Sequence, residues 1–287
     1  MTDVAGRRIE LWVEARDGAP AVNPIMRLLL NGLQSDGAVV SVRVPEHEVV
    51  DPMRPPHGPR PDLVLLKTAT TLALSLAVAD KVDGVRHLNG AHATLRAHDK
   101  AATIARLAAS GLPVPVTFLT EPGPSRTKPP GVGGAWVTKP TRGVHGRGVS
   151  VHLEFPMALD DPATLDTGSS YIVDDGTRLV QQRIGGQGAD VKVYVADGQC
   201  FAGSKRFSPI SYAEDRIEPS SLDGPTIKMI LAVGEALALR CFGVDLRFDR
   251  DRPVVIDANP FPGYRGFPDA VSALRSEVAR SLEPTRR

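Results

Sequence analysis

The sequence predicts a protein of mixed α/β and α+β class: a small parallel sheet with helices on its faces, followed by hairpin-rich lobes. Two observations predict this class. In the first third of the chain, short apolar runs alternate with helical patterns, which is typical of a parallel sheet. In the remainder, short strand patterns are separated by Gly-containing turns, which is typical of antiparallel hairpins. A chain of 287 residues is long for one core and suffices for two or three small domains.

The bulk composition excludes several classes of function. No run approaches the roughly 18 apolar residues of a membrane helix, and Met1–Gly6 does not open a signal peptide. With Lys+Arg at 34 and Asp+Glu at 33, a net charge of +1 gives no bulk attraction for nucleic acid. Cys200 and Cys241 lack zinc-type spacing, and the seven histidines form no metal-ligand pattern. We therefore expect free thiols in a cytoplasmic protein that contacts neither membrane nor nucleic acid.

Strand and helix patterns alternate through the first 90 residues. The expected strands are Ile9–Val13, Val39–Val44, Leu63–Leu66 and Val85–Leu88. Asn23 followed by Pro24 is typical of a helix N-cap, and predicts a helix that ends at Gly37. A second helix is expected over Thr70–Val82. No Gly-rich phosphate motif follows the first strand, so we do not expect a Rossmann dinucleotide site.

The middle of the chain is predicted to hold one helix and a set of antiparallel strands. The helix is expected over Ala91–Ser110, with Gly111 at its end. The expected strands are Val116–Leu119, Ala135–Lys139, Val149–Leu153 and Thr177–Ile184. A Pro- and Gly-rich loop, Glu121–Gly134, separates the first two.

A second Gly-rich segment, Pro140–Gly148, connects two of these strands. Glycines remove side chains, so that backbone N–H groups can approach a phosphate. Lys139, Arg142 and Arg147 add positive charge there. An ordinary Gly-containing hairpin is the alternative interpretation of this segment alone.

The last third is predicted to hold two hairpins and two helices. The first hairpin pairs Ala189–Ala196 with Gln199–Ser204 across Asp197-Gly198, a typical two-residue turn. On its first strand Asp190, Lys192 and Tyr194 share one face, because side chains alternate along a strand. The expected helices are Pro225–Leu239 and Asp269–Leu282.

The second hairpin, Gly243–Gly266, carries the clearest candidate site. Asp257 and Asn259 share a strand face, and Asp245 on the partner strand can lie alongside them. Two carboxylates and an amide oxygen form an oxygen-only set suited to Mg²⁺ that carries a nucleotide's phosphates. An acidic hairpin with Asx-type turns is the alternative from this stretch alone.

Taken in order, these motifs resemble the ATP-grasp superfamily over roughly residues 60–270. The markers are Asp99-Lys100, Lys139-Pro140 with Gly143, Gly146, Gly148 and Val149, Leu179–Ile184, Asp190–Val195 before Asp197-Gly198, Lys205-Arg206, Gly243–Asp245 and Asp257–Pro260. The chain is similar to the group that contains the ribosomal-protein glutamate ligase and peptide-forming ligases. The resemblance implies an ATP-grasp fold with an N-terminal α/β domain (1–90) and two α+β lobes (91–180 and 181–287) that clasp ATP.

The resemblance also implies an activity and its residues. Such ligases are ADP-forming: ATP converts a carboxylate to an acyl phosphate, and an amine displaces the phosphate. The implied nucleotide-binding residues are Lys100 and Lys139 at the phosphates, Gly143, Gly146 and Gly148 in a flap over them, and Gln182, Arg183 and Ile184 at the adenine edge. These ligases usually bind the ribose through an acid in the hinge, where this chain offers Gln182, Gln187 or, less directly, Asp190. The implied metal ligands are Asp245, Asp257 and Asn259, for Mg²⁺ or alternatively Mn²⁺. The implied catalytic residues are Arg206, at the acyl-phosphate oxygens, and Lys192, at the substrate.

Two departures leave alternatives open. The second metal ligand is usually Glu in these ligases, and Asp257 is shorter by one methylene. In addition, Val254–Tyr264 is similar to a stretch of the inositol polyphosphate kinases, so a small-molecule kinase is an alternative; a non-catalytic nucleotide-binding module is another. The ligase form of the Lys139-Pro140 flap and the low net charge argue against a kinase of polyanionic substrates. Expected partners are small carboxylate and amine substrates or a short peptide, with a homodimer as the default assembly.

Overall fold

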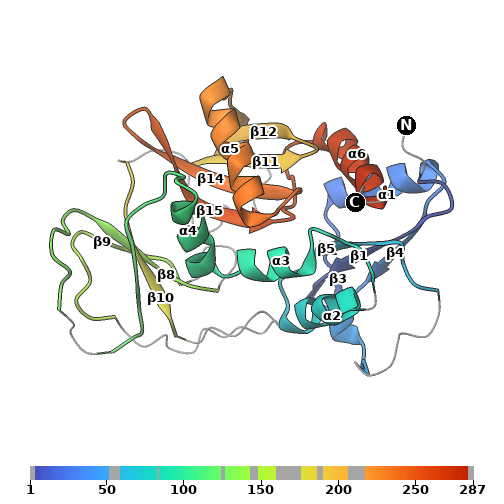
Figure 1. Cartoon of the computed structure of the whole chain (residues 1–287), viewed down its shortest axis with the longest axis horizontal. Helices are drawn as coiled ribbons and strands as arrows, with labels where there is room; N and C mark the ends of the chain where they lie inside the picture. Colours follow the sequence, from blue (N-terminus) through green and yellow to red (C-terminus); the bar gives the residue numbers. More distant parts are fainter. Residues whose placement is uncertain are drawn as a thin grey trace.

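The computed structural model describes residues 4–51, 59–82, 84–123, 127–142, 148–159, 176–185, 190–205 and 217–283. Within these residues the chain forms three main sheets, which follow one another along the long axis of the molecule (Figure 1). A parallel sheet is built from the N-terminal strands, and two antiparallel sheets from the remainder. The predicted fold class is confirmed.

The N-terminal sheet has the order β4-β1-β5-β6, and all its pairs are parallel. Its strands are β1 (Arg8–Val13), β4 (Val39–Arg43), β5 (Leu63–Lys67) and β6 (His87–Leu88). The first connection leads from β1 to β4, which lies on one side of β1 within the sheet. The next connection leads from β4 to β5, which lies on the other side of β1. The direction of the strand order therefore reverses between β1 and β5.

Two helices of the N-terminal region lie where the sequence predicts them. They are α1 (Pro24–Ser35) and α2 (Thr71–Val82). Asn23 caps α1, because its side chain accepts a hydrogen bond of 3.0 Å from the Met26 N–H. Between β1 and α1 lies a short hairpin, β2 (Ala15–Arg16) with β3 (Ala19–Pro20), which the sequence did not suggest, and a single 3-10 turn (Pro45–His47) follows β4.

The prediction of one helix over Ala91–Ser110 is wrong. Two helices occupy this range, α3 (Ala91–Ala97) and α4 (Lys100–Ala109). The break is at Asp99, whose backbone is extended and whose side chain accepts a hydrogen bond of 3.0 Å from the Ala102 N–H. Asp99 thus starts a new helix as an N-cap, and Lys100 becomes the first residue of α4.

The middle sheet has the order β7-β10-β8-β9, with antiparallel pairs. Its strands are β7 (Thr117–Thr120), β8 (Trp136–Pro140), β9 (Ser150–His152) and β10 (Arg178–Gln182), which confirms the four predicted strands. Lys139 is near the end of β8. The Gly-rich segment that follows it lies largely outside the described residues, which include Gly148 but neither Gly143 nor Gly146.

The C-terminal sheet has the order β13-β12-β11-β14-β15 and is antiparallel. Its strands are β11 (Asp190–Ala196), β12 (Gln199–Lys205), β13 (Glu218–Pro219), β14 (Phe242–Asp249) and β15 (Arg252–Pro260). Asp197 and Gly198 both have positive φ, 52° and 70°, as a two-residue turn of type I′ requires. Both predicted hairpins are therefore present.

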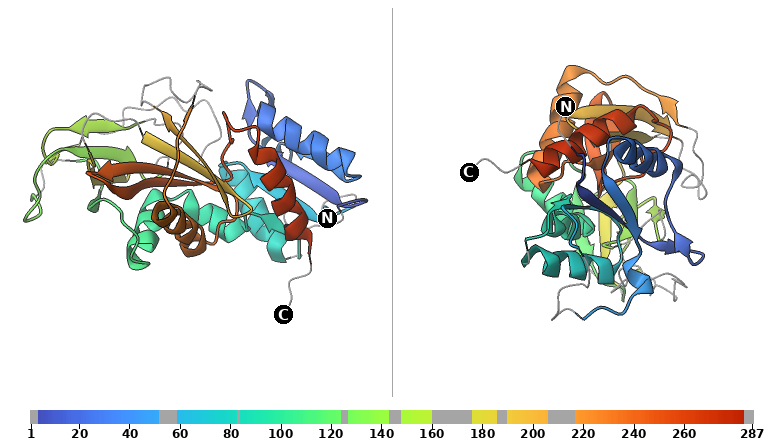
Figure 2. Two further views of the ribbon diagram at one scale, coloured as in Figure 1. Left: turned by 90° about the horizontal axis from the view of Figure 1, so that it is seen from above. Right: turned by 90° about the vertical axis from the view of Figure 1, so that its right-hand side faces the viewer.

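The remaining two helices pack on different sheets. α5 (Gly224–Leu237) covers the apolar face of the C-terminal sheet together with α3 and α4. α6 (Ala270–Leu282) instead lies beside α1, from which it is far apart in sequence (Figures 1 and 2). The end of the chain thus completes the core of the N-terminal sheet. Domain limits at residues 90 and 180 remain our proposal. None of the described helices is long and apolar enough to cross a membrane.

Candidate functional site

The candidate site begins with an irregularity in the β14–β15 hairpin. Asp245 lies opposite Asp257, but the next pair is Leu246 with Val255, so that Ile256 is an extra residue in β15. Such a bulge shifts the alternation of side chains by one. Val255 and Ala258 can then both point into the core, while Asp257 between them points to the other face. In a strand that alternates strictly through Val255, Ile256 and Asp257, Asp257 would share the buried face of Val255.

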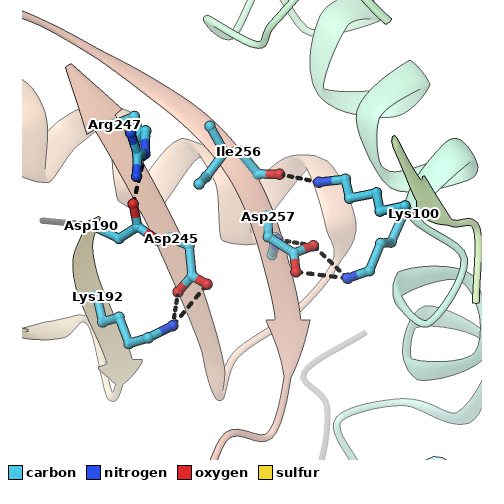
Figure 3. Close-up of polar contacts among 9 residues, drawn as sticks. Lys100, Asp190, Lys192, Asp245, Arg247, Ile256 and Asp257 are labelled. Atoms are coloured by element: carbon cyan, nitrogen blue, oxygen red, sulfur yellow. Dashed lines mark hydrogen bonds and ion pairs between the residues drawn. The ribbon is translucent and has the colours of Figure 1, made fainter. Parts of the chain in front are cut away.

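Each of the two opposed aspartates is paired with a lysine (Figure 3). Lys192 of β11 contacts Asp245 with Nζ–O distances of 2.9 and 2.8 Å. Lys100 of α4 contacts Asp257 with distances of 2.8 and 2.6 Å. Two carboxylates directly opposite each other on neighbouring strands repel, so the lysines supply the charge that lets them stay together.

A third lysine approaches the same hairpin from the middle sheet. Lys139 is buried, with 9% of its surface exposed, and its Nζ donates a hydrogen bond of 2.9 Å to the carbonyl of Ile256. Burial lowers the pKa of Lys139 to about 8; the charge of Asp257 works against this shift, and the charge of Lys100 adds to it. The bulged residue thus links the two lobes through its backbone.

The electrostatics of Asp257 reflect these neighbours. Burial alone would raise the pKa of its carboxyl, but the charges of Lys100 and Lys139 and the hydrogen bond from Lys100 outweigh burial and lower the pKa. For Lys192, burial would lower the pKa, but the charge and hydrogen bond of Asp245 raise it. The arrangement therefore brings two aspartates and three lysines together within one small region.

A third ion pair lies further along the same sheet face. Arg247 Nε donates to Asp190 with a distance of 2.7 Å (Figure 3). Burial raises the pKa of the Asp190 carboxyl, although Arg247 works against this shift. Sequence reasoning missed Arg247, even though it follows Asp245 by two residues and therefore shares its face. A contact of Asp190 with a ribose stays a prediction.

Gln182–Ile184, the segment predicted to contact adenine, already donates two backbone hydrogen bonds within the protein. The Gln182 N–H donates to the Val116 carbonyl at 2.8 Å, and the Arg183 N–H donates to the Ala135 carbonyl at 2.9 Å. An adenine contact by this segment would thus use its carbonyl groups or the Ile184 N–H. The predicted role of the segment is untested.

Other predicted residues are placed less completely. Asn259 lies opposite Gly243, and the aspartate pair lies two residues further along each strand. This spacing is consistent with Asp257 and Asn259 on the same strand face. Arg206, Gly143 and Gly146 lie outside the described residues, and Gly148 precedes β9 with a φ of 69°. Their roles remain predictions.

The donor atoms of this site fit Mg²⁺. Within the described part of the chain, no group of three or more His, Cys, Asp or Glu residues could hold a metal ion. Asp245, Asp257 and Asn259 nevertheless offer carboxylate and amide oxygens only, which is the set that Mg²⁺ prefers. Because both carboxylates already attract cationic groups, a divalent cation could take over the counter-charge from Lys100 and Lys192, which would then be available to phosphates.

No protein-family model matches this chain. One curated relative is similar to it in sequence. The relative is a probable α-L-glutamate ligase of Methanococcoides burtonii, 28% identical over 196 residues that cover 65% of this chain. The match spans 63% of the relative's own length. The activity of the whole relative therefore does not carry over without further argument.

Solved structures cover nearly the whole chain. The RimK domain protein of Sphaerobacter thermophilus aligns with a TM-score of 0.67 at 21% identity, over 96% of this chain and 99% of its own. D-cycloserine synthetase DcsG gives 0.66 at 20%, over 96% and 100%. The ligase PsnB, solved with Mg, ADP and a variant precursor, gives 0.62 at 18%, over 97% and 98%.

These alignments define the class: the chain has the ATP-grasp fold. The expected resemblance to that superfamily is confirmed. Within it, the chain is similar to a RimK domain protein by structure and to a probable α-L-glutamate ligase by sequence.

Proposed function

We propose that this protein is an ADP-forming carboxylate–amine ligase that makes an amide bond on a small amino acid or a peptide. The observation that carries the proposal is the pair of opposed aspartates, each bound by a lysine, with Lys139 at the hairpin edge. In an ATP-grasp fold, such a cluster supplies both a metal site and cations for phosphates. The similarity to a probable glutamate ligase supports the ligase class.

The reaction has two steps. A carboxylate oxygen of the first substrate attacks the γ-phosphorus of ATP, and the bond between this phosphorus and the oxygen of ADP breaks. The amine of the second substrate then attacks the acyl carbon; the bond to phosphate breaks, and the amine loses a proton. Both steps depend on positioning and on charge that stabilises phosphoryl oxygens, so no protein nucleophile is needed.

The chain's own residues divide these tasks. Lys100 and Lys139 bind the phosphates of ATP from two sides, since Lys100 approaches Asp257 from α4 and Lys139 approaches Ile256 from the middle sheet. Lys192 lies on the sheet face of the aspartates and contacts the substrate, and Arg206 stabilises the acyl-phosphate oxygens. Asp245, Asp257 and Asn259 hold Mg²⁺, whose charge offsets that of the phosphates when it is bound. PsnB, solved with Mg and ADP, supports this choice of ion, and Mn²⁺ can replace it in our proposal.

The packing of the hairpin's end weakens the case for a kinase. The similarity to inositol polyphosphate kinases includes Phe261 and Tyr264, which have 2% and 0% of their surface exposed. The Tyr264 hydroxyl donates to the Val195 carbonyl at 2.6 Å. These two residues are therefore suited to packing and cannot contact an acceptor, so their presence does not favour a phosphorylated product.

The substrates, assembly and location remain part of the proposal. Small amino acids and peptides are both suitable, since DcsG is named a D-cycloserine synthetase and PsnB was solved with a precursor peptide. We keep a homodimer as the assembly and the cytoplasm as the location, the latter because Cys200 and Cys241 are free thiols.

A coupled assay tests the function. The protein is incubated with ATP, Mg²⁺ and a mixture of amino acids, and inorganic phosphate and ADP are measured. We expect phosphate release only when a carboxylate and an amine are present together. A phosphorylated acceptor formed without free phosphate would instead identify a kinase, and nucleotide binding without any turnover would identify a non-catalytic module.

A further inference from the structure

Four charged side chains form a row across one face of the C-terminal sheet. Lys192 on β11 lies directly opposite Asp245 on β14, and Asp245 lies directly opposite Asp257 on β15. Lys100, the first residue of α4, extends the row beyond Asp257 (Figure 3). Each carboxylate therefore has an ammonium group on the side that faces away from the other carboxylate.

Each lysine contacts both oxygens of its carboxylate. Lys192 Nζ lies 2.9 and 2.8 Å from the two oxygens of Asp245, and Lys100 Nζ lies 2.8 and 2.6 Å from those of Asp257. Asp257 Oδ1 also accepts a hydrogen bond of 3.1 Å from the Ala258 N–H. The ammonium groups thus use lone pairs through which these carboxylates would bind a divalent cation, so lysine and cation compete for the same oxygens.

Partial burial makes these contacts difficult to break. The side chain of Lys100 is 14% exposed and that of Asp257 22%, while Lys192 and Asp245 are 28% and 21% exposed. Charges that are partly removed from water are screened less than surface charges. A carboxylate that lost its lysine without gaining another cation would also be left unpaired, which costs free energy. The departure of each lysine is therefore coupled to the arrival of a cation.

The backbone of Lys100 is held in place, so that its side chain is the part that can move. The Lys100 N–H donates a hydrogen bond of 2.9 Å to the Thr141 carbonyl. Thr141 directly follows β8, the strand that carries Lys139. Lys100 is thus linked through its backbone to the strand of the other lysine that we assign to the phosphates. Rotation of its side chain away from Asp257 suffices to bring the ammonium group to an anion.

We propose that Lys100 and Lys192 are internal counter-ions that exclude Mg²⁺ from Asp245 and Asp257 until anions draw the two ammonium groups away. The phosphates of ATP draw Lys100 from Asp257, and the carboxylate of the substrate draws Lys192 from Asp245. This inference rests on the proposed ligase function and adds the regulation of its metal site. It follows that the protein alone binds divalent cations weakly, and that nucleotide and cation each raise the affinity for the other.

Metal binding without nucleotide tests this coupling. The full chain is titrated with Mn²⁺ in the absence of ATP, and free Mn²⁺ is measured from its electron paramagnetic resonance signal. Lys100→Met and Lys192→Met should each bind Mn²⁺ about fivefold or more tightly than the wild type, because a competing cation is removed. Lys100→Arg, which keeps a cationic donor, should bind Mn²⁺ as weakly as the wild type.

A matched control separates competition for the carboxylates from a general effect of charge. Lys139 is a third cation at the same hairpin, but its Nζ donates to the backbone carbonyl of Ile256. Lys139→Met removes one positive charge, as Lys100→Met does, and should tighten Mn²⁺ binding clearly less. Adding Asp257→Asn to Lys100→Met should abolish the gain, because the carboxylate for which the two cations compete is then absent.

Nucleotide binding should change in the opposite direction. Lys100→Met lacks the proposed phosphate contact, so a non-hydrolysable ATP analogue with Mg²⁺ should bind about tenfold more weakly than to the wild type. A purely structural role of Lys100 would not tighten the binding of one ligand while it weakens that of the other. If Lys100→Met does not fold, Lys100→Gln replaces it with the same expected directions, since glutamine is also neutral.

Three results overturn the proposal: a Mn²⁺ affinity of Lys100→Met or Lys192→Met equal to that of the wild type, an equal gain in Lys139→Met, or a gain that persists with Asp257→Asn. Failure of the ligase function has a different signature, namely no phosphate release with any acid and amine while the lysine variants still bind Mn²⁺ more tightly. Phosphate release by the wild type with unchanged Mn²⁺ affinities in the variants would instead retain the ligase and refute the regulation.

Discussion

The two faces of the C-terminal sheet are built from alternate residues of the same strands, yet they have opposite chemistry. One face is apolar and packs on α3, α4 and α5; its members are Val193, Val195, Val244, Leu246, Val255 and Ala258. The other face is charged; its members are Asp190, Lys192, Asp245, Arg247, Asp257 and Asn259. Neighbouring residues in one strand can therefore serve stability and chemistry separately, because the period of a strand is two.

In β15 the apolar and charged faces are not made by strict alternation of residues. The bulge at Ile256 is what keeps Asp257 on the charged face while Val255 and Ala258 stay in the core. The same extra residue presents its carbonyl to Lys139. Substitutions on the two faces therefore test whether stability and activity can be changed independently.

The largest effect is expected at Asp257. Asp257→Ala removes a proposed metal ligand and the partner of Lys100, so we expect turnover to fall by roughly a thousandfold or more, which corresponds to about 4 kcal/mol in the barrier. The fold should stay intact, because the side chain is outside the apolar core. Phosphate release measures the activity, and circular dichroism measures the fold.

The control for this variant comes from the same hairpin. Asp249→Ala removes an exposed carboxylate at the turn and should leave activity unchanged. Unchanged activity in Asp257→Ala would refute the metal assignment, and an unfolded Asp257→Ala would contradict the separation of the two faces.

An intermediate effect is expected at Leu246, next to Asp245, and it concerns stability and not activity. Leu246 is fully buried, so Leu246→Ala should lower the free energy of unfolding by about 3 kcal/mol through lost burial and a cavity. Turnover per folded molecule should change little. Urea denaturation measures the first quantity, and phosphate release well below the unfolding transition measures the second.

Phe248, two residues further on and 36% exposed, supplies the comparison. Phe248→Ala should cost clearly less stability than Leu246→Ala. If Leu246→Ala abolished turnover without loss of stability, the apolar face would have a catalytic role that the packing does not suggest.

The sequence predicted what depends on local pattern. Alternation along β11 placed Asp190 and Lys192 on one face, and Asp197-Gly198 predicted its turn. The sequence pattern did not predict the break at Asp99, because the propensity of an Ala-rich segment favours one continuous helix. Only the capping by the Asp99 side chain interrupts this helix.

Contacts between distant parts of the chain lay beyond the sequence pattern. Lys100 and Asp257 are 157 residues apart and meet only because α4 packs beside β15. The bulge at Ile256 likewise depends on how Val255 and Ala258 fit the core, which tertiary packing decides. The nature of the site residues could thus be predicted, but the pairing of each aspartate with a particular lysine could not.

The smallest effect is expected at the pair of Asp190 and Arg247, further along the charged face. As a partly buried ion pair it should contribute about 1 kcal/mol, so Asp190→Asn and Arg247→Met should each lower the free energy of unfolding by that order, and the double variant should lower it by less than the sum. Binding of ATP separates the two roles of Asp190. If Asp190 also binds the ribose, Asp190→Asn alone weakens ATP binding about tenfold, whereas equal ATP affinities in both single variants would leave Asp190 a purely structural partner. That second result would divide the charged face itself into a catalytic half around Asp245 and Asp257 and a stabilising half around Arg247.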